Sequence, residues 1–263
     1  MELQRERVTQ KPRDSASVVV VRPHPDKVLE VLLLRRDPNL PLLGVAHVFP
    51  GGKTEPSDAQ VLQHLPQADQ IQLSQSLAEP ELTQAQALAL YAAALREAQE
   101  ECGLSLQAHN LVPWSRWITP GLPSLMNRRF DTRFFLACMP PDQSLTLDQR
   151  EVVEAVWCGP EEALHAYWAG DLQLAPPQLL TLTDFLAWPS LQQLWDYAQG
   201  RAPVCIRPEP FDDDAGLRHI CYPGDPLHSE PTRRMAGPTR LVYRQGRFEP
   251  LTGLHEFLTK HAP

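Results

Sequence analysis

Residues 96–104 read Arg96-Glu97-Ala98-Gln99-Glu100-Glu101-Cys102-Gly103-Leu104 and place three carboxylates within five positions. On an α-helix with about 3.6 residues per turn, Glu97, Glu100 and Glu101 fall within roughly 100° of one another, facing away from apolar residues such as Leu88. Like charges three or four residues apart weaken a helix by about 0.2–0.5 kcal/mol per pair. A bound cation would reverse that sign. The segment therefore predicts a helix with one apolar face and one metal-binding face.

The ends of this helix can be read from its capping residues. Thr83 can accept a hydrogen bond from the free amides of the first turn while Gln86 returns one, which is the pattern of a capping box. Gly103 suits the left-handed conformation that ends many helices. The sequence predicts a helix bounded by these two residues.

Composition places the chain among ordinary globular proteins. With 263 residues and 43% hydrophobic side chains, it can bury a full core. Its 24 basic and 32 acidic residues give a net charge of -8, which argues against DNA or an anionic membrane surface as a partner. A phosphate-bearing small molecule stays compatible with this charge, because a divalent cation neutralises phosphate locally.

Cysteine usage and the lack of long apolar runs favour a cytoplasmic protein. The five cysteines are dispersed and form no C-x-x-C pair, so free thiols in a reducing compartment are expected. The N-terminal residues hold no apolar segment like that of a signal peptide, and no run of about eighteen apolar residues occurs.

Hydrophobic patterning and turn residues predict a mixed set of strands and helices. Strands are expected at 15–22, 27–35, 47–49, 111–118, 130–138 and 151–158, and helices at 160–169, 176–187 and 190–199. Residues 59–82 are rich in Gln and Leu and read as a partly helical insertion that affects substrate preference more than metal binding. The last sixty or so residues are proline-rich and are expected to be mostly loop, with strand-like pieces at 217–222 and 240–248 that could pair as a hairpin.

Two segments of the chain resemble a known motif. Gly52-Lys53-Thr54-Glu55-Pro56-Ser57-Asp58, followed by residues 96–104, resembles the Nudix box, G-x5-E-x7-R-E-U-x-E-E-x-G-U, in which U is aliphatic. Asp58 stands where the pattern has Glu, and 37 residues rather than seven separate it from Arg96. With Ala46-His47-Val48-Phe49-Pro50-Gly51-Gly52 before it, this split box resembles the Nudix subgroup that includes peroxisomal coenzyme A diphosphatases. Segments 117–120, 129–132 and 154–157 add to the likeness, which covers about residues 15–165.

The resemblance implies a fold. It is an α/β protein, a Nudix-like α/β/α sandwich with a mixed β-sheet, extended by C-terminal helices and a proline-rich tail. The expected Nudix domain covers 14–170, with 59–82 inserted in the Nudix box. Residues 171–263 are expected to form a helical and loop-rich extension packed on the same domain.

The resemblance also implies a metal-dependent reaction, the attack of water on a phosphorus of a pyrophosphate. Glu97, Glu100, Glu101 and the carbonyl of Gly52 are the expected ligands of Mg²⁺ or Mn²⁺, both of which accept hard oxygen ligands. In the family pattern Arg96 pairs with a box carboxylate and fixes its rotamer. The expected catalytic residues are Glu100, Glu101 and Arg96.

The identity of the general base stays open, since clustered acids titrate as a group. Glu100 and Glu101 are candidates, and Glu151 or Glu154 from a later strand could substitute. Asp58 either takes part in the site or has a turn or capping role.

Substrate contacts are expected from Gly51, where the backbone can approach closely. They are also expected from arginines that could grip phosphates or form ordinary surface pairs, namely Arg35, Arg36, Arg128 and Arg129. Trp114 and Trp117 could stack on an adenine or belong to the core. Residues 122–127 are expected to form a loop between two strands, and their lining of the substrate is a hypothesis. Gly52-Lys53-Thr54 is not a P-loop, because that motif needs a glycine where His47 stands.

The expected substrate is a nucleoside diphosphate linked to another moiety. Subgroup likeness favours coenzyme A or acyl-CoA, with NADH, ADP-ribose, a dinucleoside polyphosphate or capped RNA as alternatives. A catalytically silent nucleotide-binding module is a second alternative. Neither DNA nor a membrane is expected as a partner, and a homodimer is left open.

Overall fold

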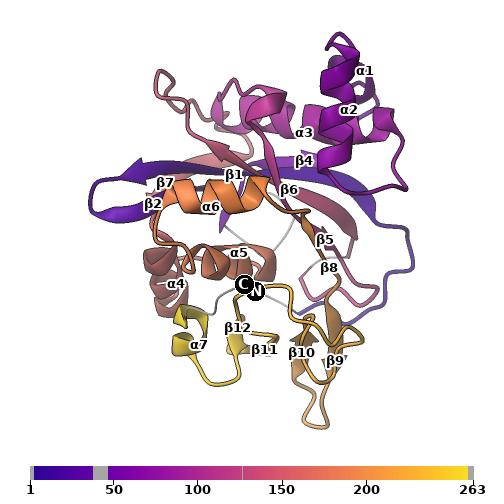
Figure 1. The fold of residues 1–263 in the computed structure, drawn as a ribbon. Coiled ribbons are helices and arrows are strands. Elements are labelled where there is room, and N and C mark those ends of the chain that lie inside the picture. Colours follow the sequence, from indigo (N-terminus) through magenta and orange to yellow (C-terminus); the bar gives the residue numbers. More distant parts are fainter. Residues whose placement is uncertain (1–2, 38–46, 126, 260–263) are drawn as a thin grey trace.

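A mixed sheet forms the middle of the molecule (Figure 1). The computed structural model describes residues 3–37, 47–125 and 127–259, and within these ranges the sheet has eight strands. They are β1 (Arg13–His24), β2 (Lys27–Arg36), β3 (His47–Val48), β4 (Gly51–Lys53), β5 (Val112–Ile118), β6 (Phe130–Cys138), β7 (Val152–Cys158) and β8 (Val204–Ile206). The order is β3-β2-β1-β6-β5-β8, with β4 paired to β1 and β7 paired to β2.

Helices cover both faces of this sheet (Figure 1). They are α1 (Asp58–Val61), α2 (Gln67–Ser76), α3 (Gln84–Cys102), α4 (Pro160–Ala169), α5 (Pro176–Phe185), α6 (Leu191–Gln199) and α7 (Leu254–Leu258), with a 3₁₀ turn at Ala108–Asn110. α3 lies on one face beside α1 and α2, and α4 and α5 lie on the other. This arrangement confirms the expected mixed α/β sandwich.

Strand β1 shows how the core is divided. Val18 and Val20 pack in the cluster under α3, whereas Val19 and Val21 pack in the cluster shared with α4 and α5. Side chains alternate along a strand, so a run of buried valines fills both cores at once. The run therefore marks a central strand covered on both faces.

The predicted ends of α3 are confirmed. The Thr83 hydroxyl accepts from the Gln86 amide and the Gln86 side chain accepts from the Thr83 amide, which completes the capping box. Gly103 adopts φ 70°, the left-handed conformation expected of the residue that ends the helix.

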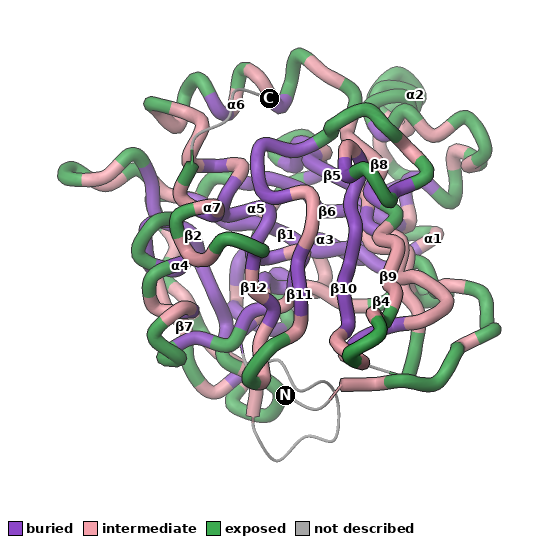
Figure 2. The backbone as a smooth tube through the Cα atoms, turned by 90° about the horizontal axis from the view of Figure 1, so that it is seen from below, coloured by how far each residue is buried: buried purple, intermediate pink, exposed green. Residues whose placement is uncertain are grey.

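The proline-rich tail is more regular than expected. It forms a second antiparallel sheet in the order β12-β11-β10-β9, whose strands are β9 (Glu209–Asp212), β10 (Arg218–Cys221), β11 (Arg240–Arg244) and β12 (Arg247–Pro250). Pairing of β10 with β11 confirms the hairpin, but 240–248 is not one strand, because Gln245 and Gly246 turn with positive φ. Pro210 and Pro250 lie in the outer strands β9 and β12, where a missing amide proton is tolerated. Figure 2 shows buried residues along β10 and β11.

Residues 59–82 pack against α3. They supply α2 and most of α1, and Leu62, Leu73 and Leu77 belong to the core under α3. Among the described residues that line the cavity introduced below, none comes from 59–82. The predicted effect of this insertion on substrate preference would therefore have to act without direct contact with the cavity.

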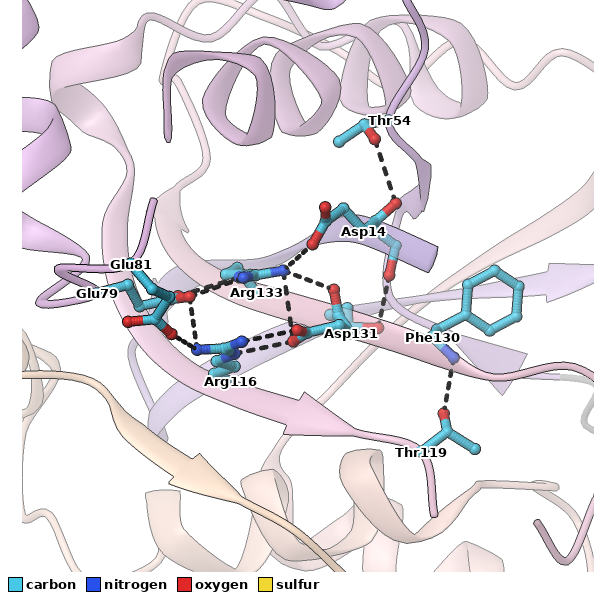
Figure 3. A network of polar contacts seen from close by, with 11 residues as sticks. Asp14, Thr54, Glu79, Glu81, Arg116, Thr119, Phe130, Asp131 and Arg133 are labelled. Atoms are coloured by element: carbon cyan, nitrogen blue, oxygen red, sulfur yellow. Dashed lines mark hydrogen bonds and ion pairs between the residues drawn. The ribbon is translucent and has the colours of Figure 1, made fainter. Parts of the chain in front are cut away.

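Ion pairs fasten the end of this insertion to the large sheet (Figure 3). Arg133 on β6 is 2% exposed and bonds both carboxylate oxygens of Glu79, at 3.0 and 2.7 Å. Arg133 also bonds Asp14 at 2.5 Å, and neighbouring Arg116 bonds Glu79 and Glu81. Breaking a buried pair leaves an uncompensated charge, at a cost of about 3–5 kcal/mol.

Glu79→Gln should therefore lower the free energy of unfolding by about 3 kcal/mol, because Arg133 loses the most buried of its carboxylate partners and Arg116 loses the same one. The matched control is Glu81→Gln. Its side chain is 57% exposed, so the loss of its pair with Arg116 should cost less than about 1 kcal/mol. Urea denaturation of the variants measures the difference, and equal losses would contradict the assignment.

Candidate active site

The site begins where α3 crosses β4. Glu101 is only 5% exposed, and its Oε2 accepts a 2.9 Å hydrogen bond from the Gly51 amide. The side chain of Glu97 is 14% exposed, whereas that of Glu100 is 58% exposed. Within the acidic face of the helix, β4 thus covers the row that holds Glu97 and Glu101 and leaves Glu100 exposed.

The two glycines of β4 permit this close packing. A Cβ at Gly52 would lie 2.2 Å from Oε1 of Glu97. A Cβ at Gly51 would lie 2.5 Å from the carbonyl oxygen of Ala16 and 2.7 Å from the Cα of Ser17, both on β1. Any side chain at these positions would displace either a carboxylate or the strand itself.

Arg96 joins the separated parts of the site. Its guanidinium donates to Asp58 at 3.0 and 3.2 Å, to Glu97 at 2.7 Å and to Glu100 at 3.1 Å. It also donates to the carbonyl oxygen of Lys53 at 3.0 Å. Burial alone would lower the pKa of Arg96, but its bonds to Asp58 and Glu97 outweigh burial and raise that pKa. The five donors of one planar group thus fix α1, β4 and the carboxylates of α3 together.

Asp58 contacts Arg96 rather than the cavity. It is 1% exposed, and its carboxylate accepts from Arg96 and from the amide of Glu55 at 2.7 Å. α1 brings the shorter Asp side chain within reach of the guanidinium across the insertion. Both functions considered for Asp58, as part of the site and in the local turn, thus correspond to contacts that it makes.

Burial disfavours the negative charge of the inner glutamates. Desolvation, with a smaller contribution from nearby Glu97, raises the pKa of Glu101 to about 8 against the opposing hydrogen bond from the Gly51 amide. Desolvation also raises the pKa of Glu97, while Arg96 opposes that rise. A cation beside these groups would favour their ionised forms.

The oxygen donors fit a partly hydrated Mg²⁺ or Mn²⁺. Within the described parts of the chain, no three His, Cys, Asp or Glu side chains enclose a metal position by themselves. Mg²⁺ usually takes one or two carboxylates and completes its octahedron with water and substrate phosphate. Glu97 and Glu101, with incompletely compensated buried charge beside the Gly52 backbone, match that donor set.

A cavity of about 1050 Å³ opens from these carboxylates. One part of its lining is polar and includes Gly51, Gly52, Arg96 and the three glutamates of α3. The other part is largely apolar and is formed by Phe49, Trp117, Phe134, Ile220, Tyr222 and Phe248. Strands from the second sheet therefore complete a cavity that begins at the large sheet.

The structure brings some of the expected site residues together and separates others. Glu151 and Arg128 line the cavity. Arg35 and Glu154 do not: they pair with each other at 2.8 Å across β2 and β7 on a half-exposed surface. Arg129 also lies outside, donating to the carbonyl oxygens of Thr119 and Gln10.

Two further arginines line the cavity: Arg13, which sequence reasoning missed, and Arg36, which it named beside Arg35 without choosing between them. Arg36 follows Arg35 on β2, and adjacent strand residues point to opposite faces, so only one of the pair can reach the site. Arg36 bonds Glu151 at 3.4 Å and its charge opposes the rise in the pKa of Glu101. Two adjacent arginines on one strand indicate that one of them lies on each face of the sheet, but the sequence does not indicate which face holds the site.

Trp117 lies in the cavity wall and packs against Tyr222, whereas Trp114 packs in the core against Phe185. Buried His47 accepts a hydrogen bond from the amide of Gln173.

Comparison with known proteins places this architecture in a family. The family model described as NUDT19 Nudix domain matches residues 106–185. A putative nudix hydrolase 7 of Caenorhabditis elegans is 26% identical over 97% of this chain and 93% of its own. The acyl-coenzyme A diphosphatase NUDT19 of Gallus gallus is 28% identical over 76% of this chain and 73% of its own. These matches support a Nudix hydrolase that resembles coenzyme A diphosphatases.

Two further likenesses agree with the assignment. The human acyl-coenzyme A diphosphatase NUDT19 is 34% identical over 44% of this chain, a stretch equal to 32% of the human chain. A crystal structure of a Nudix hydrolase from Alicyclobacillus acidocaldarius has a TM-score of 0.58 at 24% identity, covering 74% of this chain and 99% of that one. The structural likeness shows the shared fold. No helix in the described ranges has the length and apolar character needed to cross a bilayer.

Alanine substitutions at the two glycines should have different effects. Gly52→Ala meets the mobile end of Glu97, so we expect stability within about 1 kcal/mol of wild type but a displaced carboxylate and weaker Mn²⁺ binding. Gly51→Ala meets β1 backbone, so a loss of about 2 kcal/mol or more is expected. Urea denaturation and Mn²⁺ titration measure the two effects. Equal stability of the variants would refute the contact geometry.

Proposed function

We propose that this Nudix hydrolase is a Mg²⁺- or Mn²⁺-dependent diphosphatase that cleaves coenzyme A or acyl-CoA at its diphosphate. The observation that carries the proposal is a single cavity in which buried glutamates and an apolar wall meet. The names of the chicken and human relatives, acyl-coenzyme A diphosphatases, support the same substrate class.

The apolar wall suits an acyl chain. Transfer of each CH₂ group out of water contributes about 0.8 kcal/mol, so a chain of several carbons would add substantially to binding. NADH and ADP-ribose have no comparable apolar group. The wall therefore favours acyl-CoA over the other nucleotide substrates considered.

The proposed roles follow the contacts of each residue. A bound divalent cation would neutralise the diphosphate and lower the pKa of a water molecule. Glu97, Glu101 and the Gly52 carbonyl would hold it, with Glu100 turning from Arg96 to assist. Arg96 would keep Glu97 and Asp58 oriented. Glu100, Glu101 and Glu151 are our candidates for general base, since all three border the cavity, whereas Glu154 lies outside it and pairs with Arg35.

Arginines at the cavity provide contacts for further phosphate. Arg13 and Arg128 line it, and no ion pair or side-chain hydrogen bond is found for either guanidinium among the described residues. The two arginines lie on neighbouring segments, because β1 pairs in parallel with β6 and the Arg13 amide donates to the carbonyl oxygen of Arg129, next to Arg128, at 3.0 Å. Coenzyme A carries a phosphate on its ribose in addition to the diphosphate, and these arginines would bind it.

The decisive experiment is hydrolysis of a substrate panel with Mg²⁺ and Mn²⁺. Long-chain acyl-CoA, CoA, NADH, ADP-ribose, a dinucleoside polyphosphate and capped RNA are compared, with products identified by mass. We expect the highest kcat/KM for acyl-CoA. Turnover of none with either metal would favour a silent nucleotide-binding module. Cytoplasmic location and a homodimer stay predictions.

Glu101→Gln should lower kcat by about 10²-fold or more while removing most of the thermal stabilisation by Mn²⁺. Without metal, its Tm should equal or exceed that of wild type, because a buried carboxylate is replaced by a neutral amide that can still accept from Gly51. Glu154→Gln, outside the cavity, is the control and should behave like wild type. Activity of Glu101→Gln near the wild-type level would exclude the proposed site.

Replacing Arg13 and Arg128 together by Gln should raise KM for CoA by about tenfold, as expected for the loss of charged hydrogen bonds. KM for dephospho-CoA, which lacks the ribose phosphate, should change much less. Arg35→Gln is the control for loss of a positive charge outside the cavity. Equal changes for both substrates would show that these arginines do not read that phosphate.

A further inference from the structure

The inner side of β10 forms part of the cavity and also carries a buried charge. Ile220 and Tyr222 line the cavity. Arg218 lies two residues before Ile220 on the same strand, so its side chain leaves the sheet on the same side. It is 0% exposed and is the largest fully buried side chain among the described residues.

Arg218 connects three segments that are far apart in sequence. Its Nε donates to Asp212 at 2.5 Å, which pairs it with β9. Its Nη1 donates to the carbonyl oxygen of Gln4 at 3.3 Å and to the hydroxyl of Ser124 at 3.3 Å. One side chain therefore contacts the second sheet, the N-terminal segment and the chain between β5 and β6.

The chain between β5 and β6 is a wall of the cavity. We call residues 119–125 the cavity loop; Thr119, Pro120, Pro123, Ser124 and Leu125 all line the cavity. This loop contains no helix or strand, so its shape depends on contacts from elsewhere. Met126 lies outside the described residues.

The N-terminal segment, residues 3–12, holds the same loop through its backbone. The Gln4 amide donates to the Ser124 carbonyl at 2.9 Å, and the Val8 amide donates to the Gly121 carbonyl at 2.8 Å. Arg218 bonds Gln4 and Ser124 directly, so it fixes both sides of this contact. Arg5 adds an exposed pair with Asp212 at 3.3 Å.

We propose that Arg218 is a positioning residue that sets the shape of the acyl-binding part of the cavity by holding the cavity loop and the N-terminal segment against β10. The inference rests on the proposed acyl-CoA diphosphatase function. An apolar residue would fill the same space without the burial cost of a charge, but it could not donate to three segments at once. The presence of a buried arginine here is thus explained by the two segments that it holds in place, the N-terminal segment and the cavity loop.

Three variants test this. Arg218→Met keeps side-chain length and removes the donors, leaving Asp212 partly exposed and paired with Arg5. Ser124→Ala removes the loop side of the contact alone. Arg5→Gln is the matched control, because it removes the exposed pair to the same Asp212 without touching the loop.

We expect Arg218→Met to raise KM for long-chain acyl-CoA about fivefold or more, as for the loss of one or more hydrogen bonds, with kcat within about twofold of wild type. KM for free CoA should change less. Ser124→Ala should shift KM in the same direction by a smaller factor, and Arg5→Gln should leave it unchanged. Amide hydrogen exchange should become faster in residues 3–12 and 119–125 of Arg218→Met and Ser124→Ala.

The proposal would be overturned if either Arg218→Met or Ser124→Ala left both the KM for acyl-CoA and the amide hydrogen exchange unchanged. Equal changes in KM for acyl-CoA and for free CoA would also overturn it. If Arg218→Met does not fold, Ser124→Ala gives the same test. Hydrogen exchange requires no substrate, so a wild-type protein that cleaves no CoA derivative would refute the proposed function while the exchange result still tested the positioning of the loop.

Discussion

Arg96 is the residue on which the arrangement of the site depends. Its guanidinium holds Asp58 at the start of the insertion, the Lys53 carbonyl on β4, and Glu97 and Glu100 on its own helix. These groups are separated in sequence by the insertion, yet one rigid donor plane fixes their distances. The glycines of β4 then allow Glu97 and Glu101 to pack against the strand, where burial raises the pKa of both.

The cavity is built from both halves of the chain. The large sheet and α3 supply carboxylates and arginines, and the second sheet supplies much of the apolar wall through Ile220, Tyr222 and Phe248. The insertion contributes packing and ion pairs on the α3 side instead. Its end is fastened by Glu79 to the buried Arg133, away from the described lining of the cavity. The polar groups of the cavity and much of its apolar wall thus come from different parts of one fold.

Local signals in the sequence were good predictors of local structure. The bounds of β6 and α4 and the caps of α3 are confirmed, because hydrophobic period, capping residues and a terminal glycine act within a few residues. The central hairpin of the second sheet was expected, but its outer strands β9 and β12 were not recognised as separate strands, because prolines suggested loop although edge strands tolerate them. Glu101 was placed on the metal-binding face of the helix, but its burial was not foreseen, because helical periodicity does not say which strand crosses that face.

The sequence by itself determined the family resemblance, the mixed α/β class and the carboxylate cluster of α3, since these depend on residue type and short spacing. Only the tertiary structure decided that Arg36 rather than Arg35 borders the site, that Asp58 reaches Arg96, and that Arg218 holds the cavity loop. Each of these depends on contacts between segments distant in the chain. Such contacts are set by strand register and packing, which no local pattern in residues 96–104 encodes.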